Sequence, residues 1–174
     1  AQLFSTQLEI SKGQQHAQLL AQAEIRALQA QINPHFLFNA LNTIVYYCRK
    51  EPTTARDLLI HLGDFYRNNL SSLEKMVALE TEIKHIDSYV KIEQARFAVK
   101  LEVIYNIDKC CTYMVPPLIL QPIVENAIKH GVLPQKNGGK VIVTGKVRRG
   151  RINLMVEDNG VGMTPETIIR TQEA

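Results

Sequence analysis

The chain has 174 residues, of which 45% are hydrophobic and 21% charged, which fits one large or two small soluble domains with packed cores. The net charge of +3 is too small and scattered to indicate nucleic-acid binding. No apolar run approaches the roughly 18 residues that suggest a membrane span. Cys110 and Cys111 are adjacent, a poor arrangement for a structural disulfide, so a reducing compartment fits best.

The N-terminal part, from about residue 3 to 49, has the pattern of one long helix. Its apolar residues alternate steps of four and three, which is typical of a helix that pairs with another: Ala21, Ile25, Leu28 and Ile32. We therefore expect a dimer, with an ordinary amphipathic helix packed on its own domain as the alternative. The first residues look like a cut into a longer helix, so we expect an upstream region.

A proline lies inside this helical pattern, directly before a histidine, in the segment NPHFLFNALN (33–42). A helix interior normally excludes proline, because the ring removes a donor and clashes with the preceding turn. His35, Asn39 and Asn42 follow at i, i+4 and i+7 and so share one helical face. The aliphatic residues line another face: Leu37, Leu41 and Ile44. This arrangement predicts a kinked helix that exposes a histidine for chemistry.

Two more helices are predicted before residue 98. After a break at 51–54, a helix begins with Thr54 as cap and continues to about residue 70. With the first helix it would form a hairpin, and two hairpins would give a four-helix bundle. A further helix is expected over about 78–97.

The remainder of the chain alternates strand and helix patterns. Residues 101–107 predict a strand. Pro116–Pro117 is expected to open a helix that Gly131 closes. Valines 141, 143 and 147 would face residues 152, 154 and 156 in a hairpin around Arg148–Arg149–Gly150, a solvated basic turn. Thr164 would cap a last helix.

The helix before Gly131 carries polar side chains on one side. Gln121, Glu125 and Lys129 recur at i, i+4 and i+8, with Asn126 and His130 alongside. Such a set suits a nucleotide: Asn126 could hold Mg²⁺ through its oxygen, while Lys129 and His130 meet phosphate charge. The alternative is a solvated helix face with a Glu–Lys pair.

A third motif, VEDNGVGM (156–163), follows a strand end. Gly160 and Gly162 allow a ligand to approach the backbone closely, and Asp158 can accept a hydrogen bond from an amino group such as that of adenine. Alone, it could equally be a tight turn. Its position 32 residues after Asn126, with a hairpin between, makes a nucleotide site far more specific.

These motifs resemble the GHKL ATPase superfamily and, together with NPHFLFN, a LytS-type sensor histidine kinase, over roughly residues 20–170. The resemblance implies an α+β fold: a helical-hairpin dimerisation region over 1–97, a four-helix bundle as a dimer, then a Bergerat-type α/β-sandwich ATP-binding domain over 98–174. The second domain would be partial, because the chain ends at Ala174 before the Gly-x-Gly lid motif of the family.

The resemblance also implies roles for individual residues. His35 would be the phosphoacceptor, Asn126 the Mg²⁺ ligand and Asp158 the adenine contact, with Gly160 and Gly162 shaping the pocket. Less specifically, other residues would lie near the metal and phosphates: Glu125, Lys129 and His130. Asn39 would position a water for dephosphorylation, and Arg67 matches a recurrent family arginine whose alternative is a salt-bridging helix residue.

The implied function is ATP-dependent autophosphorylation of His35, followed by phosphoryl transfer to an aspartate of a response regulator receiver domain. The protein would be a homodimer on the cytoplasmic side of the membrane, below a membrane sensor region, with no nucleic-acid partner. Pro122 stands where ATP-hydrolysing relatives have a glutamate, which favours transfer to histidine. Phe36 stands where many histidine kinases have a carboxylate, so the group that orients His35 is unassigned.

Two other readings remain open. A non-catalytic dimeric signalling module with a degenerate nucleotide site would fit the missing lid motif, although the intact His35, Asn126 and Asp158 argue against it. A GHKL ATPase or protein-serine kinase would leave the His35 motif unexplained.

Overall fold

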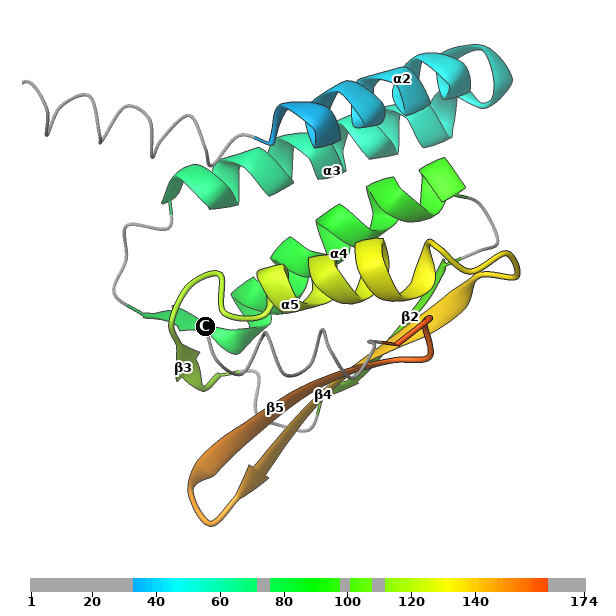
Figure 1. Cartoon of the computed structure of the whole chain (residues 1–174). Helices are drawn as coiled ribbons and strands as arrows, with labels where there is room; N and C mark the ends of the chain where they lie inside the picture. The colour runs from blue at the N-terminus through cyan, green and yellow to red at the C-terminus, as the bar shows by residue number, and fades with distance from the viewer. Residues whose placement is uncertain (1–32, 72–75, 98–100, 108–111, 163–174) are drawn as a thin grey trace, which may run out of the picture. The chain divides into compact units, whose positions relative to one another are not determined.

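A computed structural model describes residues 33–71, 76–97, 101–107 and 112–162 (Figure 1). The chain divides into two compact units, residues 1–38 and 39–174. The described part of the first unit is the start of helix α2, and all other elements belong to the second. Helices precede a mixed sheet, so the predicted α+β class is confirmed.

Helix α2 (Pro34–Lys50) begins at its proline. Asn33 is not helical and caps the helix: its Oδ1 accepts the N–H of Phe36 at 3.1 Å, and its carbonyl accepts the N–H of Leu37 at 3.1 Å. Pro34 takes the first helical position, where a missing N–H costs nothing. The prediction that one helix continues through Asn33 and Pro34 is therefore wrong, because Asn33 is not helical and the helix begins at Pro34. The expected helix before residue 33 and its apolar stripe lie outside the described residues.

Helix α3 (Pro52–Ser71) follows directly and forms a hairpin with α2 (Figure 1). It begins two residues before the expected Thr54, because Pro52 again suits a first helical position. Its buried side chains recur at helical spacing: Ala55, Leu58, Leu62 and Phe65. On α2 the buried positions are Phe36, Ala40 and Ile44, whereas Leu41, expected on the aliphatic face, is 43% exposed.

Helix α4 (Leu79–Phe97) contributes most to the core of the second unit. The short strand β1 (Val77–Ala78) precedes it and pairs antiparallel with β3 (Met114–Val115). α4 contacts α3, α5 and β2. Its largest buried apolar side chains are Leu79, Ile86, Tyr89, Val90 and Ile92. The division of the chain at residue 97 stays a prediction.

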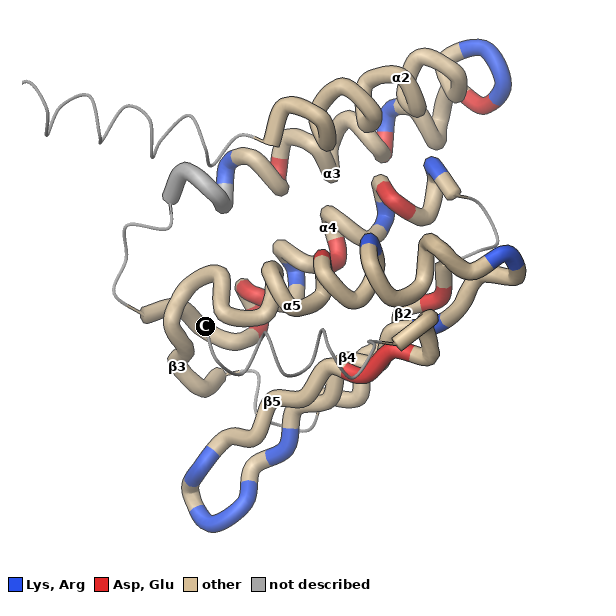
Figure 2. Tube along the Cα trace, viewed as in Figure 1, with Lys and Arg blue, Asp and Glu red and all other residues tan. Residues whose placement is uncertain are grey.

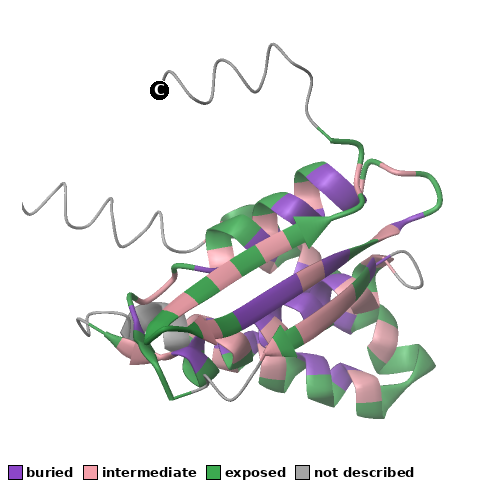
Figure 3. Cartoon of the chain, turned by 90° about the horizontal axis from the view of Figure 1, so that it is seen from below, coloured by how far each residue is buried: buried purple, intermediate pink, exposed green. Residues whose placement is uncertain are grey.

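The three-stranded sheet has the order β2-β4-β5. β2 (Leu101–Ile107) and β4 (Gly139–Arg148) are parallel, and β4 pairs antiparallel with β5 (Arg151–Asp158). Central β4 is the most buried strand, whereas β5 alternates between half-buried and exposed residues (Figure 3). The predicted strand and hairpin are confirmed.

The tip of the β4–β5 hairpin is Arg149–Gly150. Both residues have positive φ, at 51° and 74°, which suits a two-residue hairpin turn. Arg148, Arg149 and Arg151 are exposed and make the tip basic (Figure 2), as expected of a solvated turn.

Between β2 and β4 the chain forms α5 (Gln121–Asn126), which continues as the π-helix η2 (Ala127–Val132). The helix expected from Pro117 therefore begins only at Gln121, since Leu118 has a φ of 59° that breaks a helix. It also passes beyond Gly131, where the N–H of Leu133 bonds the carbonyl of Ile128 at 2.9 Å. The helix expected after Thr164 lies outside the described residues.

Candidate nucleotide site and phosphoacceptor helix

A cavity of about 260 Å³ lies between the α5–η2 helix and the end of β5. Four of the predicted site residues line it: Asn126, His130, Asp158 and Gly162. The other lining residues are Ile123, Ala127, Gly131 and Val156. Ile123 is 50% exposed and lines this cavity, which gains an apolar wall that the sequence interpretation missed.

The turn after β5 is held by side-chain oxygens. Asp158 accepts the N–H of Gly160 on Oδ1 at 2.9 Å, and Asn159 accepts the N–H of Lys140 on Oδ1 at 2.7 Å. Gly162 has a φ of 71°, which a residue with a Cβ adopts only under strain. No hydrogen bond from another described residue reaches Asp158 Oδ2, so this oxygen is available to a ligand.

Glycines bring the second and third motifs into contact. A Cβ on Gly131 would overlap the carboxylate of Asp158, and a Cβ on Gly160 would overlap the backbone of Gly131. Val161 donates its N–H to the carbonyl of Gly131 at 3.0 Å. Gly160 does not line the cavity itself, but its close approach to Gly131 fixes the turn. Gly131, expected only to end a helix, is thus part of the site.

The line Gln121, Glu125 and Lys129 does not lie on the cavity wall. Glu125 accepts hydrogen bonds from Gln121 Nε2 at 2.7 Å and from Lys129 Nζ at 2.7 Å. The Glu–Lys pair held open as the alternative is therefore present, although it is only partly exposed. The predicted roles of Glu125 and Lys129 at metal and phosphates gain no support from this geometry.

This line faces a second one on α4, formed by His85, Tyr89 and Glu93 at the same spacing. Lys129 Nζ lies 6.0 Å from the centroid of the Tyr89 ring. Burial lowers the pKa of His85 and raises the pKa of both Tyr89 and Glu93, and the charge of Glu125 acts on all three groups. Sequence reasoning missed this polar contact, although the matching spacing on the two helices signals it.

His35 is exposed at the second position of α2. The next residue, Phe36, is 3% exposed, so an apolar side chain is buried where many histidine kinases place a carboxylate.

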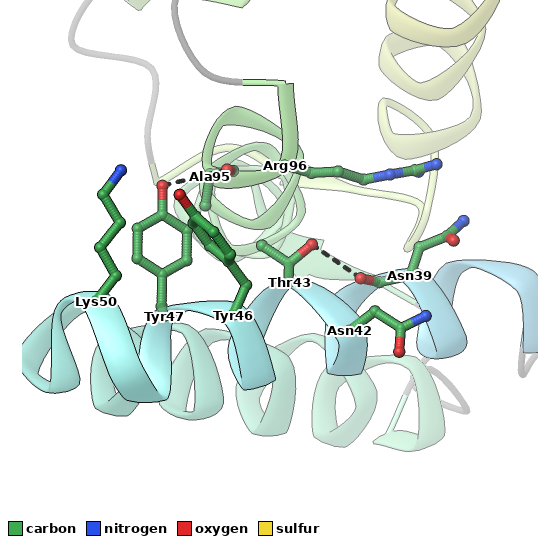
Figure 4. Close-up of a pocket in the computed structure, with 8 residues that line it drawn as sticks. All are labelled: Asn39, Asn42, Thr43, Tyr46, Tyr47, Lys50, Ala95 and Arg96. Carbon is green, nitrogen blue, oxygen red and sulfur yellow. Dashed lines mark hydrogen bonds between the residues drawn. The ribbon is translucent and has the colours of Figure 1, made fainter.

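Asn39 and Asn42 line a different cavity, of about 460 Å³, with residues of α4 (Figure 4). Tyr47 donates its hydroxyl to the carbonyl of Ala95 at 3.4 Å, and Thr43 donates to the carbonyl of Asn39 at 2.9 Å. The lining includes two cations, Lys50 and Arg96, and no carboxylate.

Three further observations concern predicted features. Arg67 pairs with Asp64 at 3.6 Å, with side chains 79% and 44% exposed, which is the salt-bridging alternative. Within the described ranges no three His, Cys, Asp or Glu residues gather in a way that could hold a metal ion. In the same ranges no helix is both long and apolar enough to span a membrane.

Comparisons with known proteins match both parts of the chain. The histidine kinase family model matches residues 23–101. The model described as histidine kinase-, DNA gyrase B- and HSP90-like ATPase matches residues 117–173. The chain thus carries a histidine kinase region followed by an ATPase domain of the GHKL class.

Individual proteins similar to the chain are named sensor proteins or sensor histidine kinases. The chain is 43% identical over 173 residues to sensor histidine kinase YpdA of Escherichia coli (strain K12), covering 99% of the chain and 31% of that protein. It is 43% identical to sensor protein LytS of Bacillus cereus and 41% identical to LytS of Bacillus subtilis (strain 168), each over 170 residues, 97% of the chain and 29% of the relative. The chain belongs to the LytS-type sensor histidine kinases and spans about three tenths of these relatives' length.

Proposed function

We propose that this chain is the core of a two-component sensor kinase that binds ATP, phosphorylates its own His35 and passes the phosphoryl group to an aspartate of a response regulator. The observation that carries this proposal is the cavity in which Asn126, His130, Asp158 and Gly162 meet. The proposal keeps a helical dimerisation region over 1–97 and an ATP-binding domain over 98–174.

The cavity suits an adenine base. Its walls include Ile123, Ala127 and Val156, which can pack against the flat ring. Asp158 Oδ2 can accept a hydrogen bond from the exocyclic amino group. Adenine recognition therefore depends on the turn that Gly131 and Gly160 hold in place.

Asn126 is the residue that fits Mg²⁺, because it lines the cavity, is exposed and carries an amide oxygen. Mg²⁺ commonly takes one or two protein ligands and completes its shell with phosphate oxygens and water, so a larger acidic cluster is not required. When bound, it would neutralise charge on the phosphates. His130 lies on the same wall and can meet a phosphate oxygen.

His35 suits the acceptor role. A ring nitrogen of a neutral imidazole can form the N–P bond while the bond from the γ-phosphorus to its bridging oxygen breaks and ADP leaves. The partial positive charge of a helix N-terminus favours the anionic phosphohistidine. Asn39, one turn later, would position a water for dephosphorylation.

We also propose a homodimer through the α2–α3 hairpin. Large apolar side chains remain exposed on both helices: Leu41, Val45, Leu59 and Ile60. A second hairpin would cover them in a four-helix bundle. Replacing Leu41 and Val45 with threonine should shift the sedimentation of the chain from dimer to monomer, whereas a wild-type monomer would contradict the bundle.

Because the relatives are named sensor proteins, we place the domain on the cytoplasmic side of a membrane, below a sensor region.

The test is transfer of labelled γ-phosphate from Mg-ATP to the 174-residue chain and to the full-length protein. We expect an acid-labile, base-stable adduct in the full-length protein that is absent from His35→Gln. His61→Gln, another histidine of the hairpin, is the control and should keep the label. A full-length protein that binds ATP but takes up no label would instead indicate a non-catalytic signalling module.

A further inference from the structure

Glu82 on α4 is a buried carboxylate outside the cavity. Glu82 is only 3% exposed. Oε1 accepts the N–H of Leu118 at 2.8 Å, and Oε2 accepts the N–H of Leu120 at 3.4 Å. These two N–H groups belong to the segment that leads directly into α5, so one carboxylate holds both.

This segment has a conformation that needs support. Leu118 has a φ of 59°, a left-handed conformation that is disfavoured for a residue with a Cβ. Leu120 is 1% exposed and therefore cannot exchange its hydrogen bond with Glu82 for one with bulk water. The start of α4 also holds the residue before β3, since Leu79 donates its N–H to the carbonyl of Tyr113 at 2.8 Å.

We propose that Glu82 is a positioning residue for the nucleotide site. By fixing residues 118–120 it sets where α5 begins, and so where Asn126, the last residue of α5, stands on the cavity wall. The nucleotide part of this inference rests on the proposed function. Asp158 lies at the end of β5, where its carboxylate accepts the N–H of Gly160, so it is tied to Glu82 only indirectly, through the contact of Gly160 with Gly131.

Amide exchange, followed by NMR on the chain without nucleotide, tests the anchoring directly. In Glu82→Gln we expect the amides of Leu118 and Leu120 to exchange about tenfold faster, because a neutral amide replaces a charged acceptor. Glu80→Gln is the matched control: Glu80 lies on the same helix, is exposed and pairs with Lys84 at 2.6 Å. Unchanged exchange in Glu82→Gln would overturn the anchoring, as would an unprotected Leu118 amide in the wild type, a measurement that needs no variant.

Ligand binding separates positioning from a merely structural role. We expect Glu82→Gln to weaken binding of Mg-ADP about tenfold and binding of adenosine less than twofold, because Asn126 follows the anchored segment directly, whereas Asp158 is tied to it only through the contact of Gly160 with Gly131. Equal losses for both ligands, or no loss for either, would overturn the positioning role. Should the wild type bind neither ligand, the proposed function fails, and the amide measurement still decides whether Glu82 anchors the segment.

Leu118→Gly supplies a rescue. Glycine adopts positive φ without strain, so the segment should depend less on its anchor. We expect Glu82→Gln to cost less Mg-ADP affinity in the Leu118→Gly background than in the wild type. An equal cost in both backgrounds would contradict the anchoring of a strained loop.

Discussion

Helices α2 and α5 each carry polar side chains at helical spacing, and the structure uses the two lines differently. On α2, His35 and Asn42 are exposed and Asn39 is half-buried. On α5 and η2, Gln121 and Lys129 both donate to Glu125, and Lys129 lies near Tyr89 of α4. Polar residues at helical spacing therefore do not by themselves distinguish an open line from one that packs against a second helix.

The other side of α5 shows the converse. Ile123 and Ala127 have the spacing of core residues, and both line the cavity with Asn126 and His130, Ile123 being 50% exposed and Ala127 buried. The helix thus has a polar side that packs and a mixed side that is open to ligand. The following predictions test this division.

The largest effect is expected at the open side. Gly131→Ala places a Cβ in the carboxylate of Asp158, so the turn must move, and the adenine contact proposed for Asp158 should be lost. We expect adenine-nucleotide affinity to fall at least ~100-fold, measured by calorimetry. Gly63→Ala is the control, because nothing lies within 4 Å of its Cβ. That variant should bind normally and gain up to ~1 kcal/mol of stability, since glycine is a poor helix former. Normal binding by Gly131→Ala would contradict the site.

Substitutions on the packed side of the helix should lower the free energy of unfolding. Lys129→Met leaves the carboxylate of Glu125 beside α4 without its ammonium partner, and the two side chains are only 34% and 20% exposed. We expect the free energy of unfolding, from urea titration, to fall by about 1–2 kcal/mol. Asn42→Ala, on the exposed line of α2, should change it by less than ~0.5 kcal/mol. Similar losses in the two variants would remove the distinction between the lines.

His85 makes the packed side sensitive to acid. Burial lowers its pKa below the usual 6.5, while Glu82, Glu125 and the carbonyl of Phe65 oppose the shift. The fold therefore favours the neutral ring. The contribution of neutral His85 to the free energy of unfolding is complete above pH 6.5 and is lost as the pH falls toward the lowered pKa. His85→Gln keeps a donor for the Phe65 carbonyl, 3.2 Å from Nε2 in the wild type, and should flatten the loss of stability between about pH 7 and 5. An unchanged slope would show that other groups cause it.

Glu93 should have the smallest effect on stability, and its dependence on pH should be opposite to that of His85. Burial raises its pKa above 4.5, although Arg96 and Lys129 work against the shift. Its contribution is complete at low pH and is lost as the pH rises through the raised pKa. Glu93→Gln should therefore gain stability relative to the wild type as the pH rises from about 4 to 8, by less than ~1 kcal/mol. A relative loss over that range would mean that its ion pairs outweigh its burial.

The sequence predicts local structure well where the signal is local. The alternation over 101–107 and the basic turn at Arg149–Gly150 give β2 and the β4–β5 hairpin, because strand period and turn chemistry depend on neighbouring residues. The predicted start of α5 at Pro117 is wrong for a tertiary reason. Glu82, 36 residues before Leu118, holds the segment after the prolines in a conformation that is not helical.

The site follows the same rule. Asp158 and Asn126 could be placed from their motifs, since each motif carries its own geometry. The apolar wall and the contact of Gly131 with Gly160 could not, because they arise only when the two motifs meet. The helix start at Pro34 was missed because Asn33 reads as a helix residue in a periodic pattern, although asparagine before proline is also a capping signal.

The most direct test of the account is adenine-nucleotide binding by the 174-residue chain, compared between Asp158→Ala and Glu125→Gln. We expect binding to be lost in Asp158→Ala and kept within about twofold in Glu125→Gln, because Asp158 lines the cavity and Glu125 does not. Equal loss in the two variants would mean that the line on α5 faces the nucleotide after all, and the two-sided description of this helix would be wrong.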